Sequence, residues 1–148
     1  MCSKNKNVKT ENWFWRDGLM SLRHRLWGVQ LPIADIDFLV VEYNFGKAVA
    51  LIEYKHEGAE IDFINPNSGM NPKSYNALND LADRSTIPFF VVQYKGDFTL
   101  WNVIPFNSLA KQKMLKGQEA MCEREYVLFL YRLRGFNSIP LEIEVKLN

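Results

Sequence analysis

The sequence predicts an α/β domain whose central mixed β-sheet contains a meander and is flanked by helices. Two near-continuous apolar runs, "DIDFLVVEY" (35–43) and "AVALIEYK" (48–55), are typical of strands that are covered on both faces. A segment with helical spacing over residues 72–84 then precedes a further apolar run, "IPFFVVQY" (87–94). These runs predict the centre of a sheet that is covered on both sides.

Length and charge limit the size of the fold and the kind of partner. The chain has 148 residues, of which 47% are hydrophobic. We therefore expect a flexible N-terminus over residues 1–10 and a single domain over residues 11–148. The 18 basic and 17 acidic residues leave a net charge of +1, so any contact with a nucleic acid would come from a local patch.

Cysteine content and hydropathy indicate the expected cellular compartment. Cys2 and Cys122 show no metal-ligand spacing, which indicates a reducing, cytoplasmic setting and not a disulfide scaffold. The polar N-terminus lacks the apolar core of a signal peptide, and no apolar stretch approaches bilayer-spanning length. We therefore expect no membrane partner and a place in the cytoplasm of a bacterial or phage-infected cell.

The first elements in the chain are a helix and a hairpin. Residues 12–27 predict the helix, because apolar side chains repeat on one face at Trp15, Leu19, Leu22 and Leu26. The strands at 35–43 and 48–55 are joined by "NFGK" (44–47), a polar connection of hairpin size that carries Gly46.

Residues 56–72 have no clean period and predict a functional or disordered connection. Asn71 and Pro72 suit the start of the helix over 72–84. Its expected buried side consists of Tyr75, Leu78, Leu81 and Ala82.

The C-terminal half predicts a second hairpin and a last helix. The runs at 87–94 and 98–104 flank Lys95, Gly96 and Asp97, a typical hairpin connection. A helix is expected over roughly 119–134, with an inner face made of Cys122, Tyr126, Phe129, Leu130 and Leu133. The alternation in "IPLEIEVKL" (139–147) predicts an edge strand or an ordered tail.

Three charged residues should meet at the end of the first hairpin. Pairing about the turn places Asp37 opposite residue 54, between Glu53 and Lys55, which share one face of the strand. Two carboxylates, completed by waters and a phosphate, make a typical Mg²⁺ site. An ammonium beside the metal could orient a nucleophile, so the pattern predicts phosphodiester hydrolysis.

These residues resemble the signature of the PD-(D/E)xK nuclease superfamily, which has the restriction-endonuclease-like fold. The superfamily core runs helix, three-stranded meander, helix, strand, and residues 12–94 supply this order, with a short first strand over 29–33. The resemblance implies that Asp37 and Glu53 bind Mg²⁺ or Mn²⁺, with the Tyr54 carbonyl as a further ligand, and that Lys55 is the catalytic lysine. It also implies duplex or branched DNA as the substrate.

Several assignments stay open at this point. Ile36 stands where the superfamily motif has Pro, and Asp35, on the same face, could replace Asp37 as the ligand. The first helix could add an acidic ligand, Glu11 or Asp17. Gln93 could reach the site or make a hydrogen bond across the sheet. The arginines of the first helix either hold the DNA backbone or form a solvated face: Arg16, Arg23 and Arg25.

The sequence thus predicts a metal-dependent DNA nuclease with an Asp/Glu-x-Lys site. The alternative is a non-catalytic nucleic-acid-binding or protein-assembly module of the same fold. A third class is a ligand-binding regulatory domain with residues 56–72 as a lid. A homodimer is expected if both strands of a duplex are cut.

Overall fold

The computed structural model describes Arg23, Leu26, Trp27, residues 36–56 and residues 73–147. Two compact units, Met1–Asp35 and Ile36–Asn148, make up the chain, and the strands and helices named here belong to the second. In chain order these elements are β1 (Phe38–Glu42), the 3₁₀ helix η2 (Tyr43–Phe45), β2 (Lys47–His56), α3 (Lys73–Arg84), β3 (Phe89–Tyr94), β4 (Trp101–Pro105), α4 (Ser108–Lys113), β5 (Glu119–Met121), α5 (Glu123–Leu133) and α6 (Leu141–Glu144).

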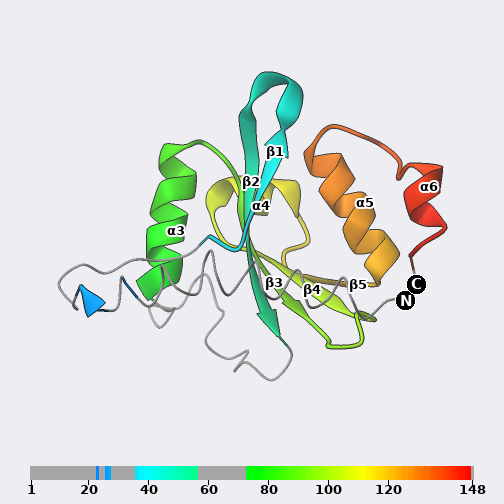
Figure 1. Cartoon of the computed structure of the whole chain (residues 1–148), viewed down its shortest axis with the longest axis horizontal. Helices are drawn as coiled ribbons and strands as arrows, with labels where there is room; N and C mark the ends of the chain where they lie inside the picture. The colour runs from blue at the N-terminus through cyan, green and yellow to red at the C-terminus, as the bar shows by residue number, and fades with distance from the viewer. Residues whose placement is uncertain (1–22, 24–25, 28–35, 57–72, 148) are drawn as a thin grey trace. The chain divides into compact units, whose positions relative to one another are not determined.

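Within the described residues, five strands form one mixed sheet in the order β1-β2-β3-β4-β5 (Figure 1). β2 and β3 are parallel, whereas the other neighbouring strands are antiparallel. The parallel pair requires a crossover between its strands, and α3 lies in that connection. The predicted α/β class, with a mixed sheet and flanking helices, is confirmed.

The hairpin of β1 and β2 turns where the polar connection predicts it. The turn consists of η2 and Gly46, whose φ of +58° lies in the left-handed region that glycine adopts without steric cost. The pairing of the two strands shifts between Val40 and Val41, an irregularity of the β-bulge type. This shift changes which residues of β1 and β2 face each other at the far end of the hairpin.

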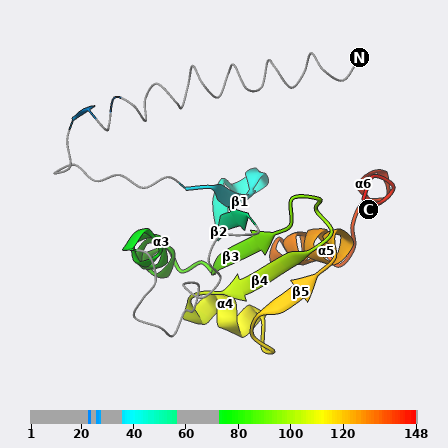
Figure 2. The ribbon, with the colours of Figure 1, turned by 90° about the horizontal axis from the view of Figure 1, so that it is seen from below.

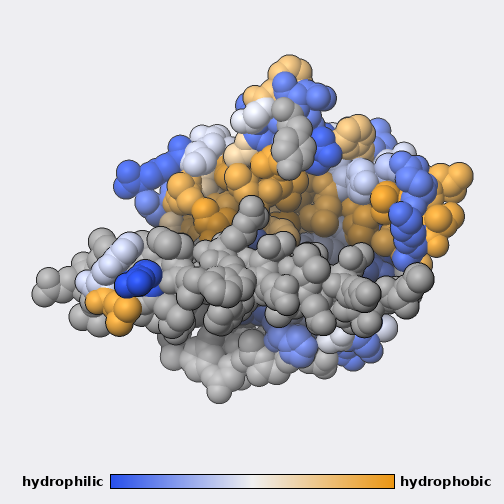
Figure 3. All heavy atoms as spheres, in the orientation of Figure 1, coloured by the Kyte–Doolittle hydropathy of each residue, from blue (hydrophilic) through white to orange (hydrophobic). Residues whose placement is uncertain are grey.

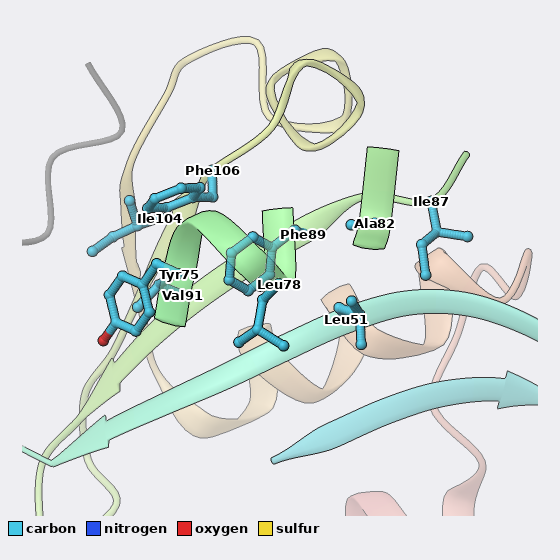
Figure 4. Close-up of a cluster of buried hydrophobic side chains, with 9 residues drawn as sticks. All are labelled: Leu51, Tyr75, Leu78, Ala82, Ile87, Phe89, Val91, Ile104 and Phe106. Atoms are coloured by element: carbon cyan, nitrogen blue, oxygen red, sulfur yellow. The ribbon is translucent and has the colours of Figure 1, made fainter. Parts of the chain in front are cut away.

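The sheet has a hydrophobic cluster on each face. The views in Figures 1 and 2 show α3 on one side of the sheet and α5 on the other. Figure 4 shows the cluster on the α3 side, which consists of Leu51, Tyr75, Leu78, Ala82, Ile87, Phe89, Val91, Ile104 and Phe106. The cluster on the other side consists of Ala50, Ile52, Phe90, Val92, Val103, Ala110, Met114, Met121 and Tyr126. The predicted buried side of α3 is thus correct except at Leu81, which is exposed.

The segment predicted as one helix over 119–134 is a strand followed by a helix. β5 pairs with β4, and α5 begins only at Glu123 because Cys122 is its N-cap residue. The Glu125 carboxylate accepts a hydrogen bond from the Cys122 N–H over 2.9 Å, which satisfies one donor at the helix start. Cys122 is therefore exposed, and its predicted place on the buried stripe is wrong, whereas Tyr126 is buried as expected.

Two short helices were not predicted. α4 follows β4 and is capped by Asn107, whose side chain accepts the N–H of Ala110. The segment over 139–147, predicted as an edge strand or an ordered tail, contains α6 and pairs with none of the described strands. The edge-strand alternative is therefore wrong, and β5 is the described strand at that sheet edge. An ion pair between Arg124 and Glu144 connects α6 to α5.

Hydrophobic residues also reach the surface in places. The space-filling view shows them over β1 and again at α6 (Figure 3). Exposed members include Phe38 and Leu39 on β1, and Leu141 and Val145 at α6. Among the described strands, β1 is the other edge of the sheet, so it has a neighbouring strand on one side only.

Some predictions lie outside the described residues. These are the flexible N-terminus, the first helix apart from Arg23, Leu26 and Trp27, the strand over 29–33, and residues 57–72 with Asn71 and Pro72. In the part of the chain that is described, no helix has the length and apolar character needed to cross a membrane.

Candidate functional site

Asp37 lies beside β2 at the open end of the first hairpin. Symmetry about the turn predicts residue 54 opposite Asp37. The observed pairing of Phe38 with Ile52, continued by one step, sets Asp37 opposite Glu53 instead. Next to the turn, Glu42 pairs with Lys47, and this pairing alone would set Asp37 opposite Ile52. The register shift, at which Val49 of β2 has no partner, moves Asp37 by one residue to Glu53. The strand pairing therefore brings the first carboxylate next to the second.

A hydrogen bond from the backbone of β2 to the Asp37 side chain holds this carboxylate beside the strand. Its Oδ2 atom accepts the N–H of Tyr54 over 2.9 Å. The N–H and C=O of one strand residue point to the same side of the strand, so the Tyr54 carbonyl also points toward β1. Asp37 is exposed, so its carboxylate can be reached from solvent.

Glu53 and Lys55 form an ion pair on the face of the sheet that α3 covers. The distance from Lys55 Nζ to Glu53 Oε1 is 2.9 Å. Glu53 is only 9% exposed, whereas about a third of the Lys55 side chain, 34%, is exposed. The Glu53 carboxylate is therefore nearly buried, whereas the Lys55 side chain is partly open to solvent.

The pKa values of both groups of this ion pair are raised, but for different reasons. Burial raises the pKa of Glu53; the hydrogen bond and charge of Lys55 oppose this rise, and the Asp37 carboxylate adds to it. Burial acts to lower the pKa of Lys55, but the hydrogen bond and charge of Glu53, together with Tyr75, outweigh it and raise that pKa. Lys55 thus stays a charged ammonium. Its single positive charge does not fully offset the cost of burying the Glu53 carboxylate.

Tyr75 of α3 is a further member of the site, and no sequence motif marks it. Lys55 Nζ lies 5.4 Å from the centroid of its ring, a cation–π distance. Burial raises the pKa of the Tyr75 hydroxyl, which Lys55 opposes, so the phenol stays protonated at neutral pH. A tyrosine on the apolar face of a helix is expected to be a core residue, and Tyr75 is only 2% exposed. Its spacing in the sequence therefore does not indicate its contact with Lys55.

Gln93 lies on the neighbouring strand at the level of Lys55. The two residues are partners in the parallel pairing of β2 and β3. The Gln93 side chain is buried, and alternation along β3 places it on the same face as Val91, under α3. Gln93 is thus positioned at the site, and its role stays a prediction.

The donor atoms of the site suit a hard divalent cation. Carboxylate oxygens of Asp37 and Glu53 and the Tyr54 carbonyl are oxygen ligands, and Mg²⁺ is commonly bound by one or two carboxylates with waters completing its shell. Among the residues that the structure describes, no group of three or more His, Cys, Asp or Glu side chains could hold a metal ion. One ammonium does not balance the charge of two carboxylates, so these residues fit Mg²⁺ or Mn²⁺.

The other candidate residues divide into two groups. Arg23 belongs to a helix and is exposed. The remaining candidates lie outside the described residues: Glu11, Arg16, Asp17, Arg25 and Asp35.

The reverse face of β2 anchors the strand that carries the site. Tyr54 alternates with Glu53 and Lys55, and its hydroxyl shares a 2.6 Å hydrogen bond with the hydroxyl of Tyr126 on α5. Its ring also packs edge-on against Trp101, with the ring centroids 6.2 Å apart. β2 is thus fixed on both faces, which holds Glu53 and Lys55 in one position.

No protein-family model matches this chain, and no curated protein or solved structure matches it either.

Proposed function

We propose that this protein is a metal-dependent DNA nuclease with a restriction-endonuclease-like fold, in which Asp37, Glu53 and Lys55 form the catalytic site. The resemblance to the PD-(D/E)xK superfamily supports the proposal through the order of β1, β2, α3 and β3 as well as through the motif. The cytoplasm of a bacterial or phage-infected cell would supply both DNA and Mg²⁺.

One observation carries the proposal: a buried carboxylate lies between an ammonium and a second carboxylate. An ordinary surface ion pair needs neither the burial of Glu53 nor the presence of Asp37 opposite it. Burying a charged carboxylate is costly, and the proximity of another one adds to the cost. A fold that keeps such an arrangement favours a role in binding or catalysis over a role in stability.

The side chains have separate roles in this proposal. Asp37, Glu53 and the Tyr54 carbonyl hold Mg²⁺ or Mn²⁺, which when bound polarises the phosphodiester and lowers the pKa of a coordinated water. Lys55 donates hydrogen bonds to the attacking water and to the phosphate oxygen that gains charge. Tyr75 packs against Lys55 and limits the positions that the ammonium can take.

The test is cleavage of supercoiled, linear and branched DNA with Mg²⁺, with Mn²⁺ and with EDTA. The wild-type protein is compared with Glu53→Gln and Lys55→Met, each of which keeps the size of the side chain. The matched control is Glu42→Gln, which breaks the 2.8 Å ion pair with Arg134 at the other end of β1. Circular dichroism and unfolding curves establish that each variant is folded.

We expect metal-dependent cleavage that falls roughly a hundredfold or more in both site variants and stays near the wild-type rate in the control. Equal residual cleavage in all four proteins would identify a contaminating nuclease. Salt-dependent DNA binding without cleavage in either metal would overturn the proposal and select the non-catalytic binding module.

A further inference from the structure

A hollow of about 680 Å³ lies among α4, β5 and α5, and it has no lining residue in common with the candidate site. Its apolar floor includes Met114, Met121, Leu128 and Phe129, of which Met114 and Met121 are buried. Figure 2 shows the three elements that border it. The volume lies in the range of sites that accept a small molecule or a few side chains of a peptide.

The rim of this hollow is positively charged. Four cations and two carboxylates line it, and one of the cations, Arg124, is already paired with Glu144. Among the described residues, the other three cations form no ion pair: Lys113, Lys116 and Arg132. One of the two carboxylates, Glu125, accepts the N–H of Cys122. The rim therefore has cations in excess over an apolar floor.

We propose that this hollow binds an acidic peptide segment of a partner protein that inserts one or two bulky apolar side chains. The apolar floor would bury those side chains, and burial of apolar surface supplies most of the affinity. Lys113 and Lys116 lie at the end of α4 and just after it, whereas Arg132 lies on α5, so the cations stand on two sides of the hollow. Carboxylates spaced along a peptide would pair with cations on both sides.

The lining disfavours a nucleic acid as the occupant. Single strands bind through stacking on exposed aromatic rings along a continuous basic groove. Here most of the floor is aliphatic or methionine, and the carboxylates of Glu119 and Glu125 interrupt the positive rim. Methionine adapts its shape to varied apolar groups, which suits a peptide ligand. The proposal does not depend on the nuclease proposal, since it rests on different residues.

The test begins with a selection of short random peptides displayed on phage against the full-length protein. We expect enriched peptides to combine Asp or Glu with Leu, Ile, Phe or Trp. Fluorescence anisotropy of a labelled enriched peptide then measures affinity as a function of salt. Replacing its acidic residues by their amides, or its apolar residues by Ser, should weaken binding about tenfold or more.

Variants of the protein locate the binding site. Arg132→Glu and Lys116→Glu should each weaken binding about tenfold, because each replaces an attraction with a repulsion. Lys47→Glu is the matched control, since Lys47 is an exposed lysine at the start of β2 that does not line the hollow. All three changes are at exposed positions, and circular dichroism checks their folding.

Three results would overturn the proposal. The first is enrichment of peptides without an excess of acidic residues, and the second is an affinity that Arg132→Glu and the control leave equally unchanged. The third is a dimer, measured by light scattering, that Arg132→Glu dissociates, because the hollow would then bind a second copy of this chain.

Discussion

Replacing Asn107 by Ala should destabilise the protein by about 3–5 kcal/mol. The Asn107 side chain is 4% exposed and makes four hydrogen bonds where α3, β3 and α4 meet. Its Oδ1 accepts the N–H groups of Phe89 (3.0 Å) and Ala110 (2.9 Å). Its Nδ2 donates to the carbonyl of Ile87 (2.9 Å) and to Asp83 Oδ1 (3.0 Å).

The magnitude follows from what each partner loses. The bond to Ala110 caps α4, and loss of such a cap costs about 1 kcal/mol. The N–H of Phe89 and the C=O of Ile87 belong to buried residues, and each lost partner costs about 1–2 kcal/mol. Asp83 is exposed and can bind water instead, so its bond adds little. These terms give about 3–5 kcal/mol.

Urea unfolding of the wild type and Asn107→Ala measures the lost stability as a shift of the unfolding midpoint at a constant m-value. Ser108→Ala is the control, because it removes an exposed hydroxyl from the first residue of the same helix. A loss below about 1 kcal/mol would refute the reasoning, since it would mean that water replaces the buried bonds of Asn107.

A second variant distinguishes the two hydrogen bonds that Asn107 donates from the two that it accepts. Asn107→Asp keeps an oxygen for the N–H groups of Phe89 and Ala110, but it turns a second oxygen toward the Ile87 carbonyl and Asp83. A protonated carboxyl can still donate one bond, so the loss of stability should be smaller at acid pH than at neutral pH. A loss that does not change with pH would contradict this account.

Three further predictions concern strain, the site and its pH dependence. Thr86 is exposed and has a φ of +56°, so Thr86→Gly should relieve strain and stabilise the fold by about 1 kcal/mol; an unchanged or lower Tm in calorimetry would contradict this. If the nuclease proposal holds, Tyr75→Phe should slow cleavage about tenfold by removing a hydroxyl beside Lys55, and an unchanged kcat would argue against that role. The raised pKa of Glu53 means that its contribution to stability is present below the unfolded pKa and is lost as pH rises through the folded pKa. Glu53→Gln should therefore gain stability relative to wild type from acid to neutral pH in metal-free urea titrations, and a gain in the opposite direction would contradict the assignment.

Local patterns determined much of the fold. The hairpin of β1 and β2, the helix α3 and the hairpin of β3 and β4 all follow from short-range signals: apolar runs, polar turns with glycine, and helical spacing. The same signals placed Asp37, Glu53 and Lys55 near one another, because two strands joined by a short turn must run antiparallel. These elements were predictable since neighbours along the chain determine each of them.

Only the tertiary structure decided the remaining features, and each depends on groups that are distant in sequence. A three-residue strand such as β5 is too short to show a period, and it exists because β4 offers a partner edge. The exact neighbour of Asp37 depends on a bulge that no pattern marks. Tyr75 approaches Lys55 because α3 packs across β2, and Asn107 connects three elements at once. A sequence pattern specifies which face of an element is buried, but the identity of the group that packs against it is decided by the energy of the assembled core.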